Sequence, residues 1–402
     1  MVDRLSTLQT FQLGLASILE RESELQRTQQ ELGTGRKLLS PADDPSAAVK
    51  VLDIEEDLAL VEQYGRNATL ARSQLSLEES ALSQLNIVLQ RVRELAIQAN
   101  SAAQTPETRN TIAVELDERL NEMISIANSK DGNDEFLFSG FQSRTQPFTR
   151  QGNTISYDGD DGQRFLDIAQ GSQVAVRDSG SRVFLQPRAG NGSFDFRADS
   201  ANSGTAVVAG TSADSSFQRD DYRIQFIQAT PADAVTYAVY DSSASLVATG
   251  TYNAGDGIRF NGATVIVEGE PRHDDVIHID SAPRQSMFVT VAELIEVLEA
   301  STDTAASDAA IANAVSSALS NMNQAVDNLL EVQTDVGVRL RRIDNQEQIN
   351  ADFELSMRKA LSDVQDLDFA EAISRLNLQL VALQAAQQTF VTTQRLSLFD
   401  YI

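Results

Sequence analysis

Apolar residues recur every three or four positions at both ends of this chain, while the middle follows another pattern. The spacing runs over residues 8–32 and again over residues 369–390. It places one narrow apolar stripe along each helix, as in a coiled-coil seam. A helix cannot bury such a stripe alone, so each terminal helix needs a partner, and the simplest partner is the other terminus. The stripe residues, which we predict to form an assembly seam, are Leu8, Phe11, Leu15, Ile18, Leu25, Leu32, Phe369, Ile373, Leu376, Leu380, Leu383 and Phe390.

The cleanest helical repeat lies further inside, over residues 315–343, where the steps alternate between four and three residues. This alternation sustains a seam for about four heptads. Helical periodicity already resumes at Met287, and we expect the C-terminal helix to run to Ser397. The apolar members of this predicted core seam are Val315, Leu319, Met322, Val326, Leu329, Val336, Leu340 and Ile343.

The N-terminal part predicts four helices. The first ends at Gly33-Thr34-Gly35, and the second spans about 46–64. The third carries a one-sided stripe from Leu77 to Ala99, and the fourth follows Thr105-Pro106, a pair typical of a helix start.

The period changes at Asp131-Gly132-Asn133 and stays changed to about Ala282. Short runs of β-branched and aromatic residues alternate there with Gly, Asp, Asn and Ser, which favours strands. Residues 236–240 and 263–267 read as strands, and Asp158-Gly159 and Asp256-Gly257 suit tight hairpins.

We therefore predict an α+β fold, in which N- and C-terminal segments form a long antiparallel helical bundle around a β-rich insert. The predicted parts are a terminal coiled-coil domain (1–40 with 360–402), a helical core domain with a β-hairpin (41–174 with 284–359) and an outer β-rich insert (175–283). An insert whose ends are held together by paired helices need not take part in what the helices do.

Composition removes several classes of function. The 402 residues include 58 acidic and 32 basic side chains, a net charge of −26, which argues against binding to nucleic acid or to anionic membranes. No cysteine is present, so disulfides and cysteine zinc sites are excluded. No stretch approaches the roughly twenty apolar residues of a membrane span. The N-terminus lacks the apolar core of a cleaved signal, so we expect a cytosolic protein or one exported with its N-terminus intact.

Two clusters could suggest chemistry. His273 and His278 are accompanied by aspartates, but a five-residue offset on a strand places the two rings on opposite faces, which favours a turn followed by a strand. Asp158-Gly-Asp-Asp-Gly162 resembles a calcium loop loosely but lacks EF-hand spacing, so a hairpin turn is favoured. We expect no catalytic residue, no cofactor and no required metal.

Polar residues interrupt the seams at Glu22, Gln29, Gln333 and Gln387. They either face solvent, or they fix register or contact neighbouring subunits, as polar seam positions can. The sequence leaves both alternatives open.

Four segments together resemble the flagellin superfamily. They are the turn Glu31–Ala48 with its Asp-Asp-Pro motif, the helix Arg91–Asn100, the helix Val336–Leu340, and Asp366–Ala372 with the Leu-Gln-Ala-Ala-Gln-Gln run. The resemblance covers about residues 1–150 and 285–402. The insert departs most from the family, so its surface role is not carried over.

Within the superfamily, three features resemble the members that form the hook–filament junction more than filament flagellins. They are Phe136–Phe141 followed by Gln146-Pro-Phe148, Pro45 in the Asp-Asp-Pro motif, and the C-terminal Leu396–Ile402. The resemblance implies a structural subunit of the bacterial flagellum, exported unfolded through the flagellar type III channel without a cleaved signal. The implied partners are the proximal junction protein, flagellin, further copies of the chain in a ring, and an export chaperone on the C-terminal helix.

Two alternatives remain, one within the flagellin superfamily and one from a different class of protein. The chain could be a filament flagellin with a β insert, or a secreted adhesin or fibre module whose helices trimerise while its β domain binds a ligand. A ligand-binding insert should carry a concave aromatic cluster, yet 175–283 offers only scattered Phe and Tyr. An enzyme in the insert is a remote third possibility.

Overall fold

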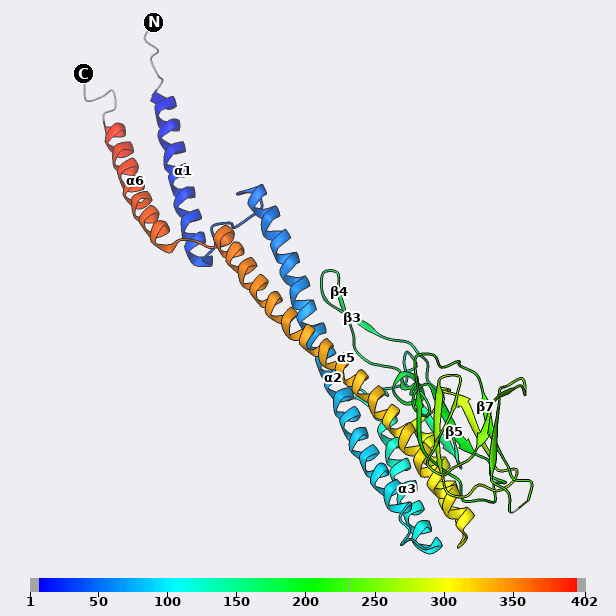
Figure 1. Cartoon of the computed structure of the whole chain (residues 1–402). Helices are drawn as coiled ribbons and strands as arrows, with labels where there is room; N and C mark the ends of the chain where they lie inside the picture. The colour runs from blue at the N-terminus through cyan, green and yellow to red at the C-terminus, as the bar shows by residue number, and fades with distance from the viewer. Residues whose placement is uncertain (1–6, 231, 396–402) are drawn as a thin grey trace, which may run out of the picture. The chain divides into compact units, whose positions relative to one another are not determined.

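A computed structural model describes residues 7–230 and 232–395 (Figure 1). The chain forms two compact units. The first comprises the described residues up to Arg66 together with those from Gln346 onward, and the second is Asn67–Asn345. None of the helices in the described part of the chain is long and apolar enough to cross a membrane.

In the described residues, six α-helices lie before and after a β-rich middle, which confirms the predicted α+β class. They are α1 (Thr7–Thr34), α2 (Pro45–Ala99), α3 (Pro106–Ala127), α4 (Met287–Glu299), α5 (Ala305–Gln365) and α6 (Phe369–Arg395). As predicted, Thr105 caps α3, accepting a hydrogen bond from the N–H of Thr108 at 3.4 Å. The predicted end at Ser397 lies outside the described residues.

The prediction of two separate helices between residues 46 and 99 is wrong. One helix, α2, continues for 55 residues, and Gly65 lies inside it. A glycine within a helix costs only about 1 kcal/mol relative to alanine, and the apolar positions on either side continue in one period. At the C-terminal end, by contrast, a break separates α5 from α6, and the Asp368 carboxylate accepts the N–H groups of Ala370 and Glu371 at 2.9 and 3.2 Å.

The larger of the two cores in the larger unit is made by α2, α3, α4, α5 and short β elements. Four phenylalanine rings lie at its centre, with Phe184 stacked on Phe288 at 5.4 Å and at an edge to Phe138 and Phe148 at 5.2 Å. The short elements are the hairpins β1 (Phe148–Gln151)–β2 (Thr154–Tyr157) and β3 (Phe165–Ala169)–β4 (Ser172–Ala175), and the single π-helical turn η1 (Ser181–Leu185).

The remaining strands form two antiparallel sheets that share a second core. Inward residues such as Phe226 and Ile277 of one sheet and Val208 and Val265 of the other are fully buried, so the sheets pack as a sandwich. The five-stranded sheet has the order β5 (Phe194–Ala198), β12 (Val276–Ser281), β7 (Tyr222–Ile227), β8 (Thr236–Tyr240), β9 (Leu246–Thr251), and the three-stranded sheet has the order β10 (Gly257–Phe260), β11 (Ala263–Glu268), β6 (Val207–Ala213).

The sandwich begins at β5, later than the insert boundary predicted at residue 175. Val176, Val183 and Phe184 pack in the helical core instead. The chain enters and leaves the sandwich at one place, because Ala189 donates its N–H to Pro283 at 2.8 Å and Gln285 donates to Pro187 at 2.9 Å. The division into three domains stays a proposal. In it, the boundary between the helical core domain and the β-rich insert now lies at the hydrogen-bonded crossing of Ala189 and Pro283.

Both strand predictions are confirmed by β8 and β11, but both hairpin turns were predicted at the wrong place. Asp158-Gly159 follows β2, and Asp256-Gly257 joins β9 to β10, which belong to different sheets. The turn between β10 and β11 is Asn261-Gly262, where φ is +42° and +80°. Asn-Gly is a strong hairpin signal because both residues tolerate this left-handed backbone.

A buried ionic network joins α2, the segment before η1, and α5. The Asp178 side chain is fully buried and accepts two hydrogen bonds from Arg339 at 2.9 and 3.1 Å and one from Arg182 at 2.7 Å. Glu78 of α2 is also buried and accepts the N–H of Asp178 at 3.1 Å. Burial and the neighbouring Asp178 carboxylate raise the pKa of Glu78 to about 8.

The pKa of Glu78 predicts how stability depends on pH. The folded chain keeps this proton up to a pH of about 8, whereas an unfolded chain releases it near 4.5. The free energy of unfolding should therefore fall as pH rises between these values, by at most about 1.4 kcal/mol per unit from this group. Urea unfolding measured between pH 5 and 8 should show that the free energy of unfolding falls less steeply with pH in the Glu78→Gln variant than in the original chain. Glu79→Gln, on the exposed side of α2, should keep the original slope, and an unchanged slope in Glu78→Gln would contradict the assignment.

Removing the sandwich should leave the helical core folded. We expect a chain in which Gly190 is joined to Ala282 by a short Gly/Ser linker to keep its helical circular dichroism and a cooperative melt, because the crossing at Ala189 and Pro283 already closes the loop. Asn313 of α5, which is buried against the sandwich, would become exposed to water in this variant. Its side chain is polar, so this exposure should cost little. An aggregated product would show that the helical core depends on the sandwich.

Candidate assembly surface

The terminal helices α1 and α6 lie side by side in opposite directions (Figure 1). Near one end of the pair, the rings of Phe11 and Phe390 lie 5.3 Å apart. Near the other end, Arg375 donates to the Glu31 carboxylate at 3.0 Å. Each terminus therefore is the other's partner, as the stripes predicted.

The predicted assembly seam is divided between two faces of this pair. Residues on the face between the two helices are buried, such as Leu25 with 8% of its surface exposed. Residues on the outward face are exposed to solvent, such as Ile373 with 49%. The side chain of Leu8 lies outside the described residues. The half-buried members are Ile18, Leu32, Leu376, Leu383 and Phe390, and the exposed members are Phe11, Leu15, Phe369, Ile373 and Leu380.

The sequence stripe missed further exposed apolar residues in the same unit. Leu13 and Leu378 expose 59% and 69% of their surfaces and lie off the three-four spacing. The single stripe that the spacing predicts does not include them, so no sequence signal marked them. The others are Leu19, Val49, Leu52, Leu60, Ile349, Phe353, Leu355, Val381 and Val391.

Very little of this unit is buried. Among its described apolar residues, only Leu25, Ile54, Val61, Leu367 and Ala372 are buried. Soluble monomers rarely expose large apolar patches, and exposed apolar residues that gather on one surface are typical of a site of protein association. The terminal unit thus exposes apolar side chains of the kind that protein interfaces bury.

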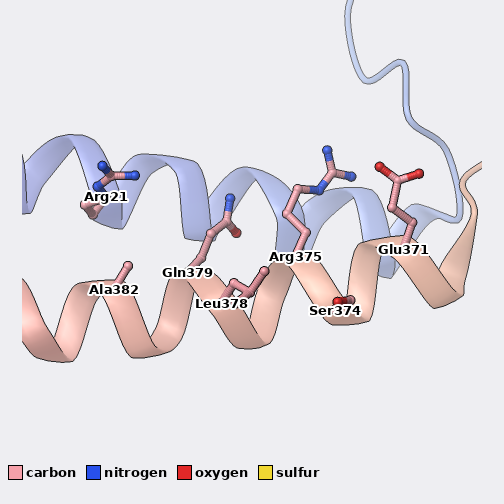
Figure 2. Close-up of a pocket in the computed structure, with 7 residues that line it drawn as sticks. All are labelled: Arg21, Glu371, Ser374, Arg375, Leu378, Gln379 and Ala382. Atoms are coloured by element: carbon pink, nitrogen blue, oxygen red, sulfur yellow. The ribbon is translucent and has the colours of Figure 1, made fainter.

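A shallow groove of about 460 Å³ runs along the helix pair (Figure 2). Arg21 of α1 faces it from one side, and α6 provides the rest of the lining, including Leu378 and Gln379. The Gln379 Oε1 atom is buried and has no hydrogen-bond partner among the described residues. Arginine, amide and leucine side chains of this kind suit contact with another polypeptide.

The turn from α1 to α2 is fixed by the Asp-Asp-Pro motif. Asp43 accepts the N–H groups of Leu39 and Ser40 at 3.1 and 2.9 Å, and these hydrogen bonds hold its pKa below the usual range. Arg27 of α1 also contacts Asp43 at 2.9 Å. Asp44 accepts the N–H groups at the start of α2, which lowers its pKa in the same way. The motif therefore sets where α1 ends and α2 begins.

The polar seam residues are not buried in the single chain. Glu22, Gln29 and Gln387 are exposed, and Gln333 is half-buried. Their contact with neighbouring subunits stays a prediction. The polar side chains that the pair does bury are Thr28 and Glu31, which sequence reasoning missed.

The predicted core seam lies on α5 in the core of the larger unit, whereas α1 and α6 belong to the smaller unit. Val336, for example, is fully buried. The other buried members are Val315, Met322, Leu329 and Ile343, and the partly buried members are Leu319, Val326 and Leu340.

The candidate chemical sites have structural roles. His278 lies 3.2 Å from Asp199, and His273 accepts the N–H of Gln228 at 3.2 Å. Asp160 accepts the N–H groups of Phe141 and Gln142, at 2.9 and 3.1 Å, so the Asp158–Gly162 segment supports a loop rather than a hairpin. The described residues contain no group of three His, Cys, Asp or Glu that could hold a metal ion.

Known proteins resemble this chain over nearly its whole length. The bacterial flagellin N-terminal helical region matches residues 5–143. Flagellar hook-associated protein 3 of Escherichia coli (strain K12) is 22% identical over 397 residues, which is 99% of both chains.

Two solved structures are more similar in sequence. Flagellar hook associated protein-3 from Legionella pneumophila is 31% identical with a TM-score of 0.74, and the match covers 77% of this chain and 98% of that one. FlgL from Xanthomonas campestris is also 31% identical, with a TM-score of 0.71 and coverage of 77% and 99%.

Proposed function

Because this chain belongs to the family of flagellar hook-associated protein 3, or FlgL, we propose that its paired terminal helices are the surface through which copies assemble at the hook–filament junction. The protein is a structural component of the bacterial flagellum, as the resemblance implied. The family assignment replaces the filament-flagellin and adhesin alternatives. We propose that it has no catalytic activity, since its prominent surface is apolar and helical.

The observation that carries this proposal is the exposed apolar surface of α1 and α6. Burial of a leucine or isoleucine contributes roughly 1.5–3 kcal/mol, so several outward residues per copy supply enough free energy to drive association. A tube of terminal helices would bury the outward faces of neighbouring copies. Folding of the helix pair and incorporation of the subunit would then be coupled.

The partners follow from the same surface. We propose that copies form a ring, with the proximal junction protein on one side and the first flagellin subunits on the other. Before assembly, an export chaperone would cover the apolar face of the C-terminal helix while the chain passes unfolded through the flagellar type III channel, without a cleaved signal. The net charge of −26 supports partners other than nucleic acid or anionic membrane.

Electron microscopy of isolated hook–filament complexes, labelled with gold-conjugated antibody against this protein, tests the proposal. We expect label at one level, where hook meets filament. Complexes from a strain lacking the protein are the control for antibody specificity. Label along the whole filament would contradict a junction role and restore the flagellin alternative.

A further inference from the structure

A second groove, of about 800 Å³, lies in the larger unit between β5 on one side and α4 and α5 on the other. The five consecutive residues Asp195–Asp199 line it. Side chains on a strand point alternately to opposite faces, so consecutive lining residues mean that the groove follows the edge of the strand. β5 is the end strand of its sheet, and this edge has no neighbouring strand.

The hydrogen bonds at the two ends of β5 show which of its backbone N–H and C=O groups point toward β12 and which point away. Ser193 and Asp199 hydrogen-bond to the segment that contains β12, at 3.1 and 3.0 Å. In an antiparallel ladder these groups alternate along the strand, so those of Phe194, Phe196 and Ala198 point away from β12. The outward groups therefore face the groove.

Only some of these outward groups are occupied. Asn191 accepts the N–H of Phe194 at 3.0 Å, and the Asp195 carboxylate accepts the N–H of Phe196 at 2.8 Å. In the part of the chain that the structure describes, the Phe196 carbonyl and both backbone groups of Ala198 have no hydrogen bond within the chain. An exposed strand edge of this kind pairs with an added extended segment.

The charges of the groove select the kind of segment. The β5–β12 register places Asp195 directly opposite Asp280, an unfavourable pairing of like charges. Glu293 of α4 lines the other wall, and burial together with these two carboxylates raises the pKa of Asp195 to about 6. Among the described lining residues, Arg197 is the one basic side chain. Asp195 and Glu293 accept hydrogen bonds from neutral side chains, Ser317 at 3.5 Å and Gln285 at 3.0 Å, and have no cation as a salt-bridge partner in the described part of the chain.

The helical wall leaves room for a polypeptide. The lining residues of α5 are mostly small, including Ala306, Ala310 and Ala314 at successive turns. A strand added to a sheet lies about 4.8 Å from its neighbour, and small side chains opposite the edge leave space for it. The described residues form no cluster that could hold a metal ion, so a side-chain cation fits better.

We propose that this groove binds an extended, basic segment of a partner protein, which adds as a strand at the edge of β5 and places lysine or arginine between Asp195, Asp280 and Glu293. This site is separate from the terminal helices. A negative result for peptide binding at this groove would therefore leave the proposed assembly function untouched, and a negative result for assembly would leave this proposal untouched.

The test measures binding of a fluorescent peptide of alternating lysine and valine to the full chain by anisotropy. Two matched peptides separate charge from strand addition. One carries glutamate in place of lysine, and the other keeps the lysines but is N-methylated on the backbone edge that would pair with β5. We expect no binding of the first and at least about tenfold weaker binding of the second. Equal binding of the N-methylated peptide would overturn strand addition.

The double variant Asp195→Asn/Glu293→Gln should bind the lysine peptide at least about tenfold more weakly. Asp327→Asn/Glu331→Gln removes the same charges from exposed positions of α5 outside the groove lining, and should bind as the original chain does. The groove variant should fold normally because it removes the like-charge pair, and a thermal melt checks this. Equal affinity of the two variants would overturn the proposal.

Discussion

Replacing Ile373 and Leu380 together with aspartate should abolish assembly at the junction while shifting the melting temperature of the purified monomer by no more than about 2 °C. Both side chains are open in the single chain, with 49% and 37% of their surfaces exposed. In the assembly each would lose the burial of the part of its apolar surface that is still exposed, roughly 1 kcal/mol, and each buried unpaired carboxylate would cost several kcal/mol more. Leu383 is avoided because it is already half-buried.

Cells that carry this variant should build hooks, fail to build filaments, and release flagellin into the medium. Motility in soft agar, electron microscopy of hooks and immunoblots of the medium are the measurements. Leu246→Asp, at an exposed apolar position of β9, is the matched control and should swim normally. Normal filaments in the double variant would mean that the outward face of α6 is not buried in the junction, and an unfolded monomer would mean that it already packs before assembly.

The second large effect concerns the buried ionic network. Arg339→Met should lower the free energy of unfolding by about 3–5 kcal/mol at neutral pH, because it leaves the buried Asp178 carboxylate without its two-point partner. Urea unfolding of the purified chain measures this loss. Adding Asp178→Asn to the same chain should recover part of it, since the neutral amide needs no cation.

Arg341→Met is the matched control for this substitution. Arg341 lies on the same helix with its side chain exposed, so we expect a change within about 0.5 kcal/mol. A loss below about 1 kcal/mol in Arg339→Met would mean that the remaining donors to Asp178, Arg182 and Gln163, are sufficient partners for its carboxylate.

The strongest sequence signals led to the correct elements. The long alternating repeat around Leu329 became α5, and Thr105 started α3, because local spacing and capping chemistry decide these elements. The helix break expected before Leu77 failed because one glycine is too weak to end a helix whose two sides share one period. The hairpin predictions chose Asp-Gly pairs and overlooked Asn261-Gly262, which is flanked by strands on both sides.

The candidate site was only partly visible in the sequence. The stripe containing Leu380 predicted which helices pair, but a spacing pattern does not say which residues the pair leaves exposed. Leu378 therefore appeared only in the structure. The contact of Asp178 with Arg339 spans 161 positions, and no local pattern connects such residues. Likewise, the edge of β5 becomes a groove only once α4 and α5 lie beside it.

The crossing at Ala189 and Pro283 has a mechanical consequence. Tension applied along the helices enters and leaves the sandwich at the same point, so the hydrogen bonds of this crossing carry the tension before it reaches the strands. The sandwich therefore bears no tension as long as the hydrogen bonds of this crossing hold. Unfolding of the sandwich would then leave the length of the helical core unchanged. Loops of the sandwich can likewise vary in length without weakening the attachment of the filament.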